Sequence, residues 1–172
     1  FNIRMENWTG IYKRSWLIEH DIKFNESPGA GFQDNGFWFQ TYCWANKIAV
    51  LDEAFYCYRQ DNAASSINQS NKVFVMLDEY QWIENWLRSN PQLCQKFIGI
   101  FEYKKTHNCE FAFSRLANEF QLPFLERYAA EYRRAFGNNE IDEKLFWPDE
   151  IKRLKRIVAD PESYVIELRS GR

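Results

Sequence analysis

Asp34 is the acidic residue whose setting in this sequence best suits catalysis. It follows a Pro- and Gly-containing loop from Ser27 to Gly31 and precedes a dense aromatic run from Phe37 to Trp44. Pro and Gly interrupt both regular periods, so the sequence predicts a loop that leads to Asp34 and a helix that begins close to it. A carboxylate at the mouth of such a helix can act as a general base that removes the proton of an attacking hydroxyl group.

Asp34 also has a structural alternative, because Asp is a favoured N-cap whose side chain accepts a backbone N–H. The two roles place opposite demands on the pKa of the carboxyl group. A helix N-terminus lowers that pKa, whereas a general base is most effective when its pKa lies near the working pH. A catalytic role therefore requires a partly buried carboxylate, or a transition state in which the proton is transferred late.

Three further side chains are candidates for contacts with a sugar or a phosphate group. Trp8 can pack against the apolar face of a sugar ring, with burial in the core as the alternative. Arg59 can bind a phosphate through its planar guanidinium group, or it can pair with Asp61 or Glu53. Tyr58 lies next to Arg59 on a predicted strand, where simple burial is the alternative.

The composition limits the classes of function that need to be considered. Aromatic residues make up 18% of the 172 residues, which supports a substantial core. A net charge of −2 gives no general attraction to nucleic acid. The four cysteines contain no C-x-x-C pair, and His20 and His107 have no companions at catalytic spacing, so we interpret the cysteines as free thiols and expect no zinc site. No stretch approaches the ~20 apolar residues of a membrane span.

The pattern of apolar residues predicts a mainly α fold with a small β component. Short apolar runs at 48–51 and 54–58 predict two strands at the edge of a sheet. The polar segment 60–71 marks a boundary that divides the chain into residues 1–70 and residues 71–172. The predicted helices span residues 11–20, 34–46, 73–89, 93–120, 123–136, 148–159 and 161–168.

Several short segments within the first 70 residues resemble a known family in their order and spacing. The segments are W-T-G-I-Y-K-R-S-W-L (Trp8 to Leu17), F-N-E-S-P-G-A (Phe24 to Ala30), Q-D-N-G-F-W-F (Gln33 to Phe39) and F-Y-C-Y-R-Q-D-N (Phe55 to Asn62), followed by Ser65-Ser66. Together they resemble the acceptor-side half of bacterial family 2 glycosyltransferases. The resemblance covers roughly a third of the chain, and the remainder has no counterpart in it.

The resemblance implies that residues 1–70 are the C-terminal part of a GT-A type α/β domain and that residues 71–172 are a helical extension. The implied reaction transfers a sugar from a nucleotide-sugar donor to a glycan hydroxyl in surface polysaccharide synthesis, with inversion of the anomeric carbon. Asp34 corresponds to the catalytic base of the family. Gln33 stands where many members carry Glu, so a single carboxylate remains at this motif, and we include Gln33 among the candidate binding residues.

The sequence lacks the family's D-x-D motif and any Gly-rich phosphate loop. The resemblance therefore implies a divalent metal, Mn²⁺ or Mg²⁺, whose ligands lie in an N-terminal half that we expect to precede Phe1. This chain alone is then expected to be inactive. We expect a cytoplasmic location. A basic cluster lies in the predicted helix 148–159. We expect it either to face solvent or to make a peripheral contact with the inner membrane. Its residues are Lys152, Arg153, Lys155 and Arg156.

The rival hypothesis is a non-catalytic helical module that binds a partner protein. In that case Asp34 only caps a helix, and the aromatic helices provide the binding surface. An upstream α/β half with a D-x-D motif favours the enzyme over the module. Because residues 1–70 lack sheet neighbours in this chain, we expect them either to dock on the helices after residue 71 or to associate with another copy through an exposed strand edge.

Overall fold

The computed structural model describes residues 6–26, 31–59, 61 and 73–170. Helices make up 68% of these residues, which contain no β-strand, so the predicted mainly α fold is confirmed. The elements are η1 (Asn7–Thr9), α1 (Arg14–Glu19), α2 (Asp34–Trp44), α3 (Val75–Arg88), α4 (Pro91–Phe113), α5 (Asn118–Gly137), η3 (Glu143–Leu145), α6 (Pro148–Ala159) and α7 (Pro161–Ser170).

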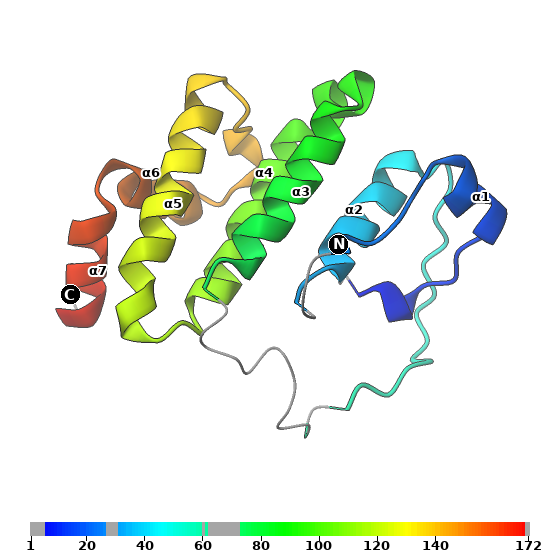
Figure 1. Ribbon diagram of the computed structural model, residues 1–172, viewed down its shortest axis with the longest axis horizontal. Helices are drawn as coiled ribbons and strands as arrows, with labels where there is room; N and C mark the ends of the chain where they lie inside the picture. Colours follow the sequence, from blue (N-terminus) through cyan, green and yellow to red (C-terminus); the bar gives the residue numbers. More distant parts are fainter. Residues whose placement is uncertain (1–5, 27–30, 60, 62–72, 171–172) are drawn as a thin grey trace.

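Helices α3 and α4 pack side by side at the centre of the molecule (Figure 1). Helix α2 packs against α3, with η1 and α1 on the same side of this central pair. Helix α5 lies on the other side, and both α6 and α7 pack on α5. The chain therefore places Asp34 and its surroundings at one end of a row of helices.

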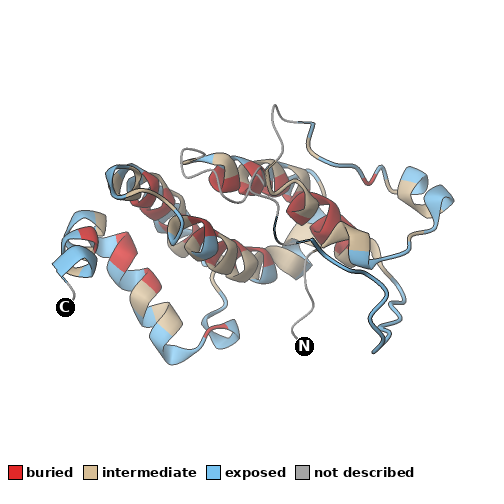
Figure 2. Ribbon diagram, turned by 90° about the horizontal axis from the view of Figure 1, so that it is seen from below, coloured by how far each residue is buried: buried red, intermediate tan, exposed pale blue. Residues whose placement is uncertain are grey.

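The core follows the apolar stripe of α3, as the sequence period predicts. Leu77, Tyr80, Ile83 and Leu87 recur at spacings of three or four residues and are at most 1% exposed. Figure 2 shows buried residues along the facing sides of the central helices. This stripe fixes which side of α3 faces its neighbours.

Helix α2 belongs to the same core as the helices that follow residue 71. Phe39 is 2% exposed, and its ring centroid lies 5.8 Å from that of Phe101 on α4 and 6.2 Å from that of Trp86 on α3. Trp38 is also buried, beneath the ammonium group of Lys104. The described residues on the two sides of the predicted boundary therefore share one hydrophobic core. The boundary segment 60–71 itself lies outside the described residues except for residue 61.

The two strands predicted at 48–51 and 54–58 are absent, and both segments are irregular. A strand requires a neighbouring backbone with which to form a hydrogen-bonded ladder, and no part of the described chain supplies one. Large apolar side chains consequently remain in solvent, with Leu51 70% exposed and Phe55 74% exposed. The predicted small β component is therefore not present in the described residues, and no GT-A sheet is seen among them.

Of the four prolines among the described residues, three open a helix. Pro91, Pro148 and Pro161 each occupy the first position of a helix, where their missing N–H costs no hydrogen bond. The sequence predicts that Pro123 also opens a helix, but this residue lies inside α5, which begins at Asn118. Its position within the first two turns limits the loss to one backbone hydrogen bond near the helix end.

Candidate functional site

Asp34 is the first residue of α2, and Gln33 occupies the N-cap position before it. The side chain of Asp34 is half-buried. Burial raises the pKa of Asp34 above its ordinary value, and the charge of Glu6 adds to that rise, whereas the backbone N–H groups of Asp34 and Asn35 oppose it. The overall direction is upward, as a general base in this position requires.

A second carboxylate, Glu79 of α3, lies at the same helix end. Its Oε1 accepts a hydrogen bond from the backbone N–H of Gly36 at 3.1 Å, and its Oε2 accepts one from Asn25 Nδ2 at 2.9 Å. Glu79 is only 2% exposed. Burial, with a contribution from the charge of Asp34, raises the pKa of Glu79 to about 7. Two carboxyl groups therefore lie at the start of α2, that of Asp34 in α2 and that of Glu79 in α3, and the pKa of each is raised.

Sequence reasoning missed Glu79, although the sequence contains a signal for it. Glu79 stands three residues after Met76 and four before Ile83, on the stripe that also includes Tyr80. A charged residue on an apolar stripe is buried when the helix packs, and buried charges require partners. The partners, Asn25 and the Gly36 backbone, lie 54 and 43 residues away, so the sequence period does not reveal them.

A polar network ties the first turn of α2 to α4. Asn108 Nδ2 donates to Asn35 Oδ1 at 2.8 Å and to the hydroxyl of Tyr80 at 2.7 Å. Asn35 Nδ2 in turn donates to the carbonyl of Phe32 at 2.9 Å. Because Asn35 is buried, these bonds satisfy polar groups that would otherwise be costly to remove from water. The network fixes the backbone next to Asp34.

Two of the predicted binding residues, Trp8 and Tyr58, meet in the structure. Their rings are stacked, with centroids 5.3 Å apart and planes 2° apart, and the ring of Tyr56 lies 6.0 Å from that of Trp8. Tyr58 is 52% exposed, so its predicted burial alternative does not apply. Element η1, which carries Trp8, packs against α2, and Glu6 next to η1 acts on the pKa of Asp34. We call Trp8, Tyr56 and Tyr58 the aromatic wall.

Arg59 forms the local ion pair that was its alternative role. Its Nε lies 2.6 Å from Asp61 Oδ1, and both side chains are more than three-quarters exposed. Such a pair contributes little to stability. Gln33 is adjacent to Asp34 in the chain, so the N-cap position and the candidate base are neighbours at the start of α2.

The described residues contain no group of three or more His, Cys, Asp or Glu side chains arranged to hold a metal ion. His20 stacks on Trp44 with ring centroids 4.5 Å apart. His107 lies 3.0 Å from Glu150, and its other ring nitrogen contacts the Tyr103 carbonyl. The four cysteines are free, and among them Cys57 is exposed. The contacts of His20 and His107 described here do not include Asp34. That the histidines have no role in chemistry stays a prediction.

The basic cluster of α6 is largely neutralised by acidic neighbours. Three of its four cations form ion pairs, and Lys152 is exposed. The ion pairs are Arg153 with Glu110, Lys155 with Glu143, and Arg156 with Glu167.

No helix in the described part of the chain has the length and apolar character needed to cross a bilayer.

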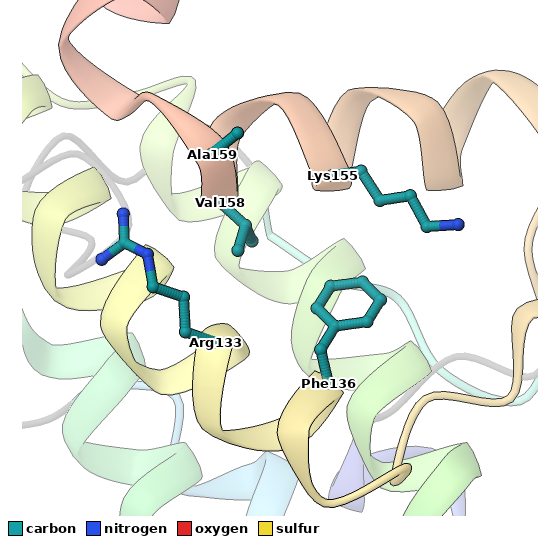
Figure 3. A pocket seen from close by; sticks show the side chains of 5 residues that line it. All are labelled: Arg133, Phe136, Lys155, Val158 and Ala159. Carbon is teal, nitrogen blue, oxygen red and sulfur yellow. The ribbon is translucent and has the colours of Figure 1, made fainter.

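An open groove of about 360 Å³ lies between α5 and α6 (Figure 3). Arg133 and Lys155 flank it, and Phe136, Val158 and Ala159 provide apolar lining. Figure 1 places these two helices on the far side of α3 and α4 from α2. We therefore assign the groove no part in chemistry at Asp34.

Comparisons with protein-family models, with curated proteins and with solved structures found no match to this chain. Two observations consequently bear on its function. One is the resemblance of the short segments between Trp8 and Ser66, and the other is the geometry around Asp34. Both concern the same end of the row of helices.

Proposed function

We propose that this chain is the acceptor-side part of a nucleotide-sugar-dependent glycosyltransferase in which Asp34 is the general base. The observation that carries the proposal is the half-buried Asp34 carboxyl group at the start of α2, with its pKa raised mainly by burial. A surface carboxylate that only capped a helix would have its pKa lowered. The order of motifs around Asp34 supplies the reaction class by resemblance.

In the proposed reaction, Asp34 accepts the proton of an acceptor hydroxyl while that oxygen attacks the anomeric carbon of the donor sugar. The new C–O bond forms as the bond between the anomeric carbon and the diphosphate oxygen breaks, so the configuration is inverted. The nucleoside diphosphate carries away the electron pair, and Asp34 later releases its proton to solvent. Proton transfer of this kind typically accelerates a reaction by ~10²–10⁴-fold.

The aromatic wall is the proposed platform for a sugar ring. Trp8 and Tyr58 present stacked rings next to the helix that carries Asp34, and two of the three wall residues are about half exposed. Aromatic faces pack well against the C–H groups of sugars because both surfaces are apolar and flat. Gln33 and Arg59 remain proposed polar contacts for the acceptor or donor, although Arg59 has to leave Asp61 to bind a phosphate.

The divalent metal implied by the resemblance does not fit the described residues, since they offer no set of three ligands. We derive no step through it, and its ligands belong, in this proposal, to another part of the enzyme. The proposed location is cytoplasmic. Contact with the inner membrane through the basic cluster requires Arg153, Lys155 and Arg156 to exchange their acidic partners for lipid headgroups.

The direct test is turnover by a protein that contains this chain together with its natural upstream sequence. The protein is incubated with UDP- and GDP-sugars, Mn²⁺ and a panel of glycan acceptors, and release of the nucleoside diphosphate is followed by chromatography. Acceptor-dependent release supports the proposal. Failure with every donor, by a protein shown to be folded, argues against it.

The second candidate function is a non-catalytic interaction module. The exposed apolar side chains between residues 48 and 58 favour it, since Val50 is 65% exposed and Phe55 is 74% exposed. Contiguous apolar surface of this kind often marks an interface. Sedimentation of the chain over a range of concentrations distinguishes self-association through this segment from a monomer. Turnover that depends on Asp34 would rule against the module as the whole function.

A further inference from the structure

The two carboxylate oxygens of Glu79 reach both sides of the loop that leads into α2. Oε2 accepts from the side chain of Asn25, before the loop, and Oε1 accepts from the N–H of Gly36, after it. Asp34 lies between these two anchor points in the sequence. One buried side chain on α3 therefore constrains both ends of the segment that presents the proposed base.

Gly36 is the residue that allows α3 to come this close. A Cβ atom added at Gly36 would lie 2.6 Å from Glu79 Oε1 and 2.6 Å from the ring of Trp82. Both distances are shorter than any ordinary contact, so a side chain at this position and the present place of Glu79 exclude each other. The small residue in α2 and the buried acid in α3 form one arrangement, although 43 residues separate them.

The hydrogen bond to Gly36 also affects the surroundings of Asp34. The first N–H groups of a helix lack partners within the helix and are available to a nearby carboxylate. The N–H of Gly36, the third residue of α2, is directed to Glu79, and the N–H of Asn35 donates to the Phe32 carbonyl at 3.0 Å. The backbone groups that lower the pKa of Asp34 are those of Asp34 and Asn35, and the Gly36 N–H is not among them.

We propose that Glu79 is a positioning residue for Asp34, because it anchors the chain on both sides of the base, at Asn25 and at Gly36. This inference rests on the proposed function of Asp34. It implies that the helices after residue 71 are part of the site, because α3 supplies Glu79 and α4 supplies Asn108, which binds Asn35 beside the base. The raised pKa of Asp34 is consistent with this role.

The test uses readouts that need no substrate. In the chain carrying Glu79→Ala, hydrogen exchange of the Gly36 amide is expected to accelerate by about tenfold or more, since its buried acceptor is lost. The pKa of Asp34, followed by its carboxyl ¹³C shift, is expected to fall, because the neighbouring Glu79 carboxyl group is removed and water can enter the space that it leaves. Glu79→Gln keeps an acceptor for Gly36 and should restore slow exchange.

Two further variants keep the test decisive. Asn25→Ala removes one of the two anchors. It should lower the pKa of Asp34 by less than Glu79→Ala does. This variant provides the test if Glu79→Ala does not fold. Asp78→Asn removes the neighbouring, exposed carboxylate of α3 and should change neither readout. Unchanged Gly36 exchange and an unchanged Asp34 pKa in both Glu79→Ala and Asn25→Ala would overturn the proposal.

The same variants separate this inference from the proposed function. If the natural enzyme transfers sugar, Glu79→Ala should lower kcat with little change in the KM for the donor, and Glu79→Gln should recover most of the loss. If no transfer is found for the unaltered enzyme while the exchange and titration results appear as expected, the proposed function is wrong and Glu79 still positions Asp34.

Discussion

The indole of Trp8 and the phenol ring of Tyr58 stack almost parallel, with their planes only 2° apart, although 50 residues separate their positions in the chain. Tyr58 is 52% exposed, so this pair forms a surface and not a core contact. The indole N–H of Trp8 is buried and has no hydrogen-bond partner among the described residues. The exposed part of the Tyr58 ring is therefore accessible to a ligand.

Trp8→Ala is expected to raise the KM for the glycan acceptor by about 2–10-fold, the effect of losing an aromatic contact of ~0.5–1.5 kcal/mol. The KM for the nucleotide-sugar should change little, because the wall belongs to the proposed acceptor side. Trp147→Ala provides a control, since Trp147 is 71% exposed and lies at the start of the far helix α6. Equal rises in the KM for the donor and the KM for the acceptor would show that the aromatic wall is not specific to the acceptor.

Asp34→Asn is expected to lower turnover of the natural enzyme by ~10²–10⁴-fold, the usual contribution of a general base. The free energy of unfolding should change by less than about 1 kcal/mol, because Asn keeps the size of Asp and no N-cap is lost, since Gln33 occupies the cap position. Donor binding, measured by calorimetry, should be retained. Asp149→Asn is the matched control and should have little effect, because Asp149 is an exposed carboxylate in the first turn of the far helix α6. Near-normal turnover of Asp34→Asn would mean that another group is the base.

Gly36→Ala is expected to destabilise the chain by ~1–3 kcal/mol, as overpacking in a core does. The added methyl group would meet Glu79 and Trp82, and this clash should exceed the ~1 kcal/mol that Ala gains over Gly in a helix. Gly137→Ala is the control, because a methyl group added at Gly137 would have no atom within 4 Å of it. Urea unfolding of the two variants measures both effects, and equal stabilities would contradict the close approach of α3 to α2.

Stability is expected to fall as the pH rises from about 4.5 to above 7. Burial raises the pKa of both Glu79 and Glu102 to about 7, although Lys105 acts against the rise at Glu102. A raised pKa in the folded state means that the folded chain binds more protons than the unfolded chain in this range. The resulting stability is complete below pH 4.5 and is lost as the pH passes 7.

Glu79 and Glu102 each contribute at most about 3 kcal/mol to this change in the free energy of unfolding. Urea unfolding at pH 5, 6, 7 and 8 measures the trend. Glu79→Gln and Glu102→Gln should each flatten the curve, because Gln does not ionise. A curve of the unaltered chain that rises steadily between pH 5 and pH 8 would show that these carboxyl groups are ionised in the fold.

The isolated chain is expected to bind nucleotide-sugars no more tightly than about millimolar, or ~4 kcal/mol of binding free energy. The reason is the lack of a Gly-rich phosphate loop in the sequence and of a three-ligand metal group in the described residues. Calorimetry with UDP- and GDP-sugars in the presence of Mn²⁺ measures this affinity. Micromolar binding would reveal a donor site within the chain.

The sequence predicts the helices well where apolar residues recur at the helical period. The stripe of α3, including Leu77 and Leu87, and the prolines that open α4, α6 and α7 are local signals. The prediction of strands at 48–51 and 54–58 is wrong, because the composition of these segments favours strands but the described chain offers no partner backbone.

The candidate site could be predicted only in part. Asp34 is recognisable from its loop and helix, but its burial depends on the packing of η1 and α3 around it. Glu79 and Asn108 reach the first turn of α2 from two other helices, and contacts of this kind have no sequence period. Propensity and periodicity describe single elements, whereas the site arises where three of them meet.

Cys57 provides a chemical handle on the aromatic wall. It is an exposed free thiol between Tyr56 and Tyr58, the two tyrosines that contact Trp8. The buried Cys43 and Cys109 are much less reactive, because burial raises the pKa of Cys43 to about 12 and that of Cys109 further still. Burial also raises the pKa of Cys94, which is only partly exposed. A maleimide dye should therefore attach chiefly at Cys57, where its emission would be quenched by the nearby indole and would respond when a glycan displaces it.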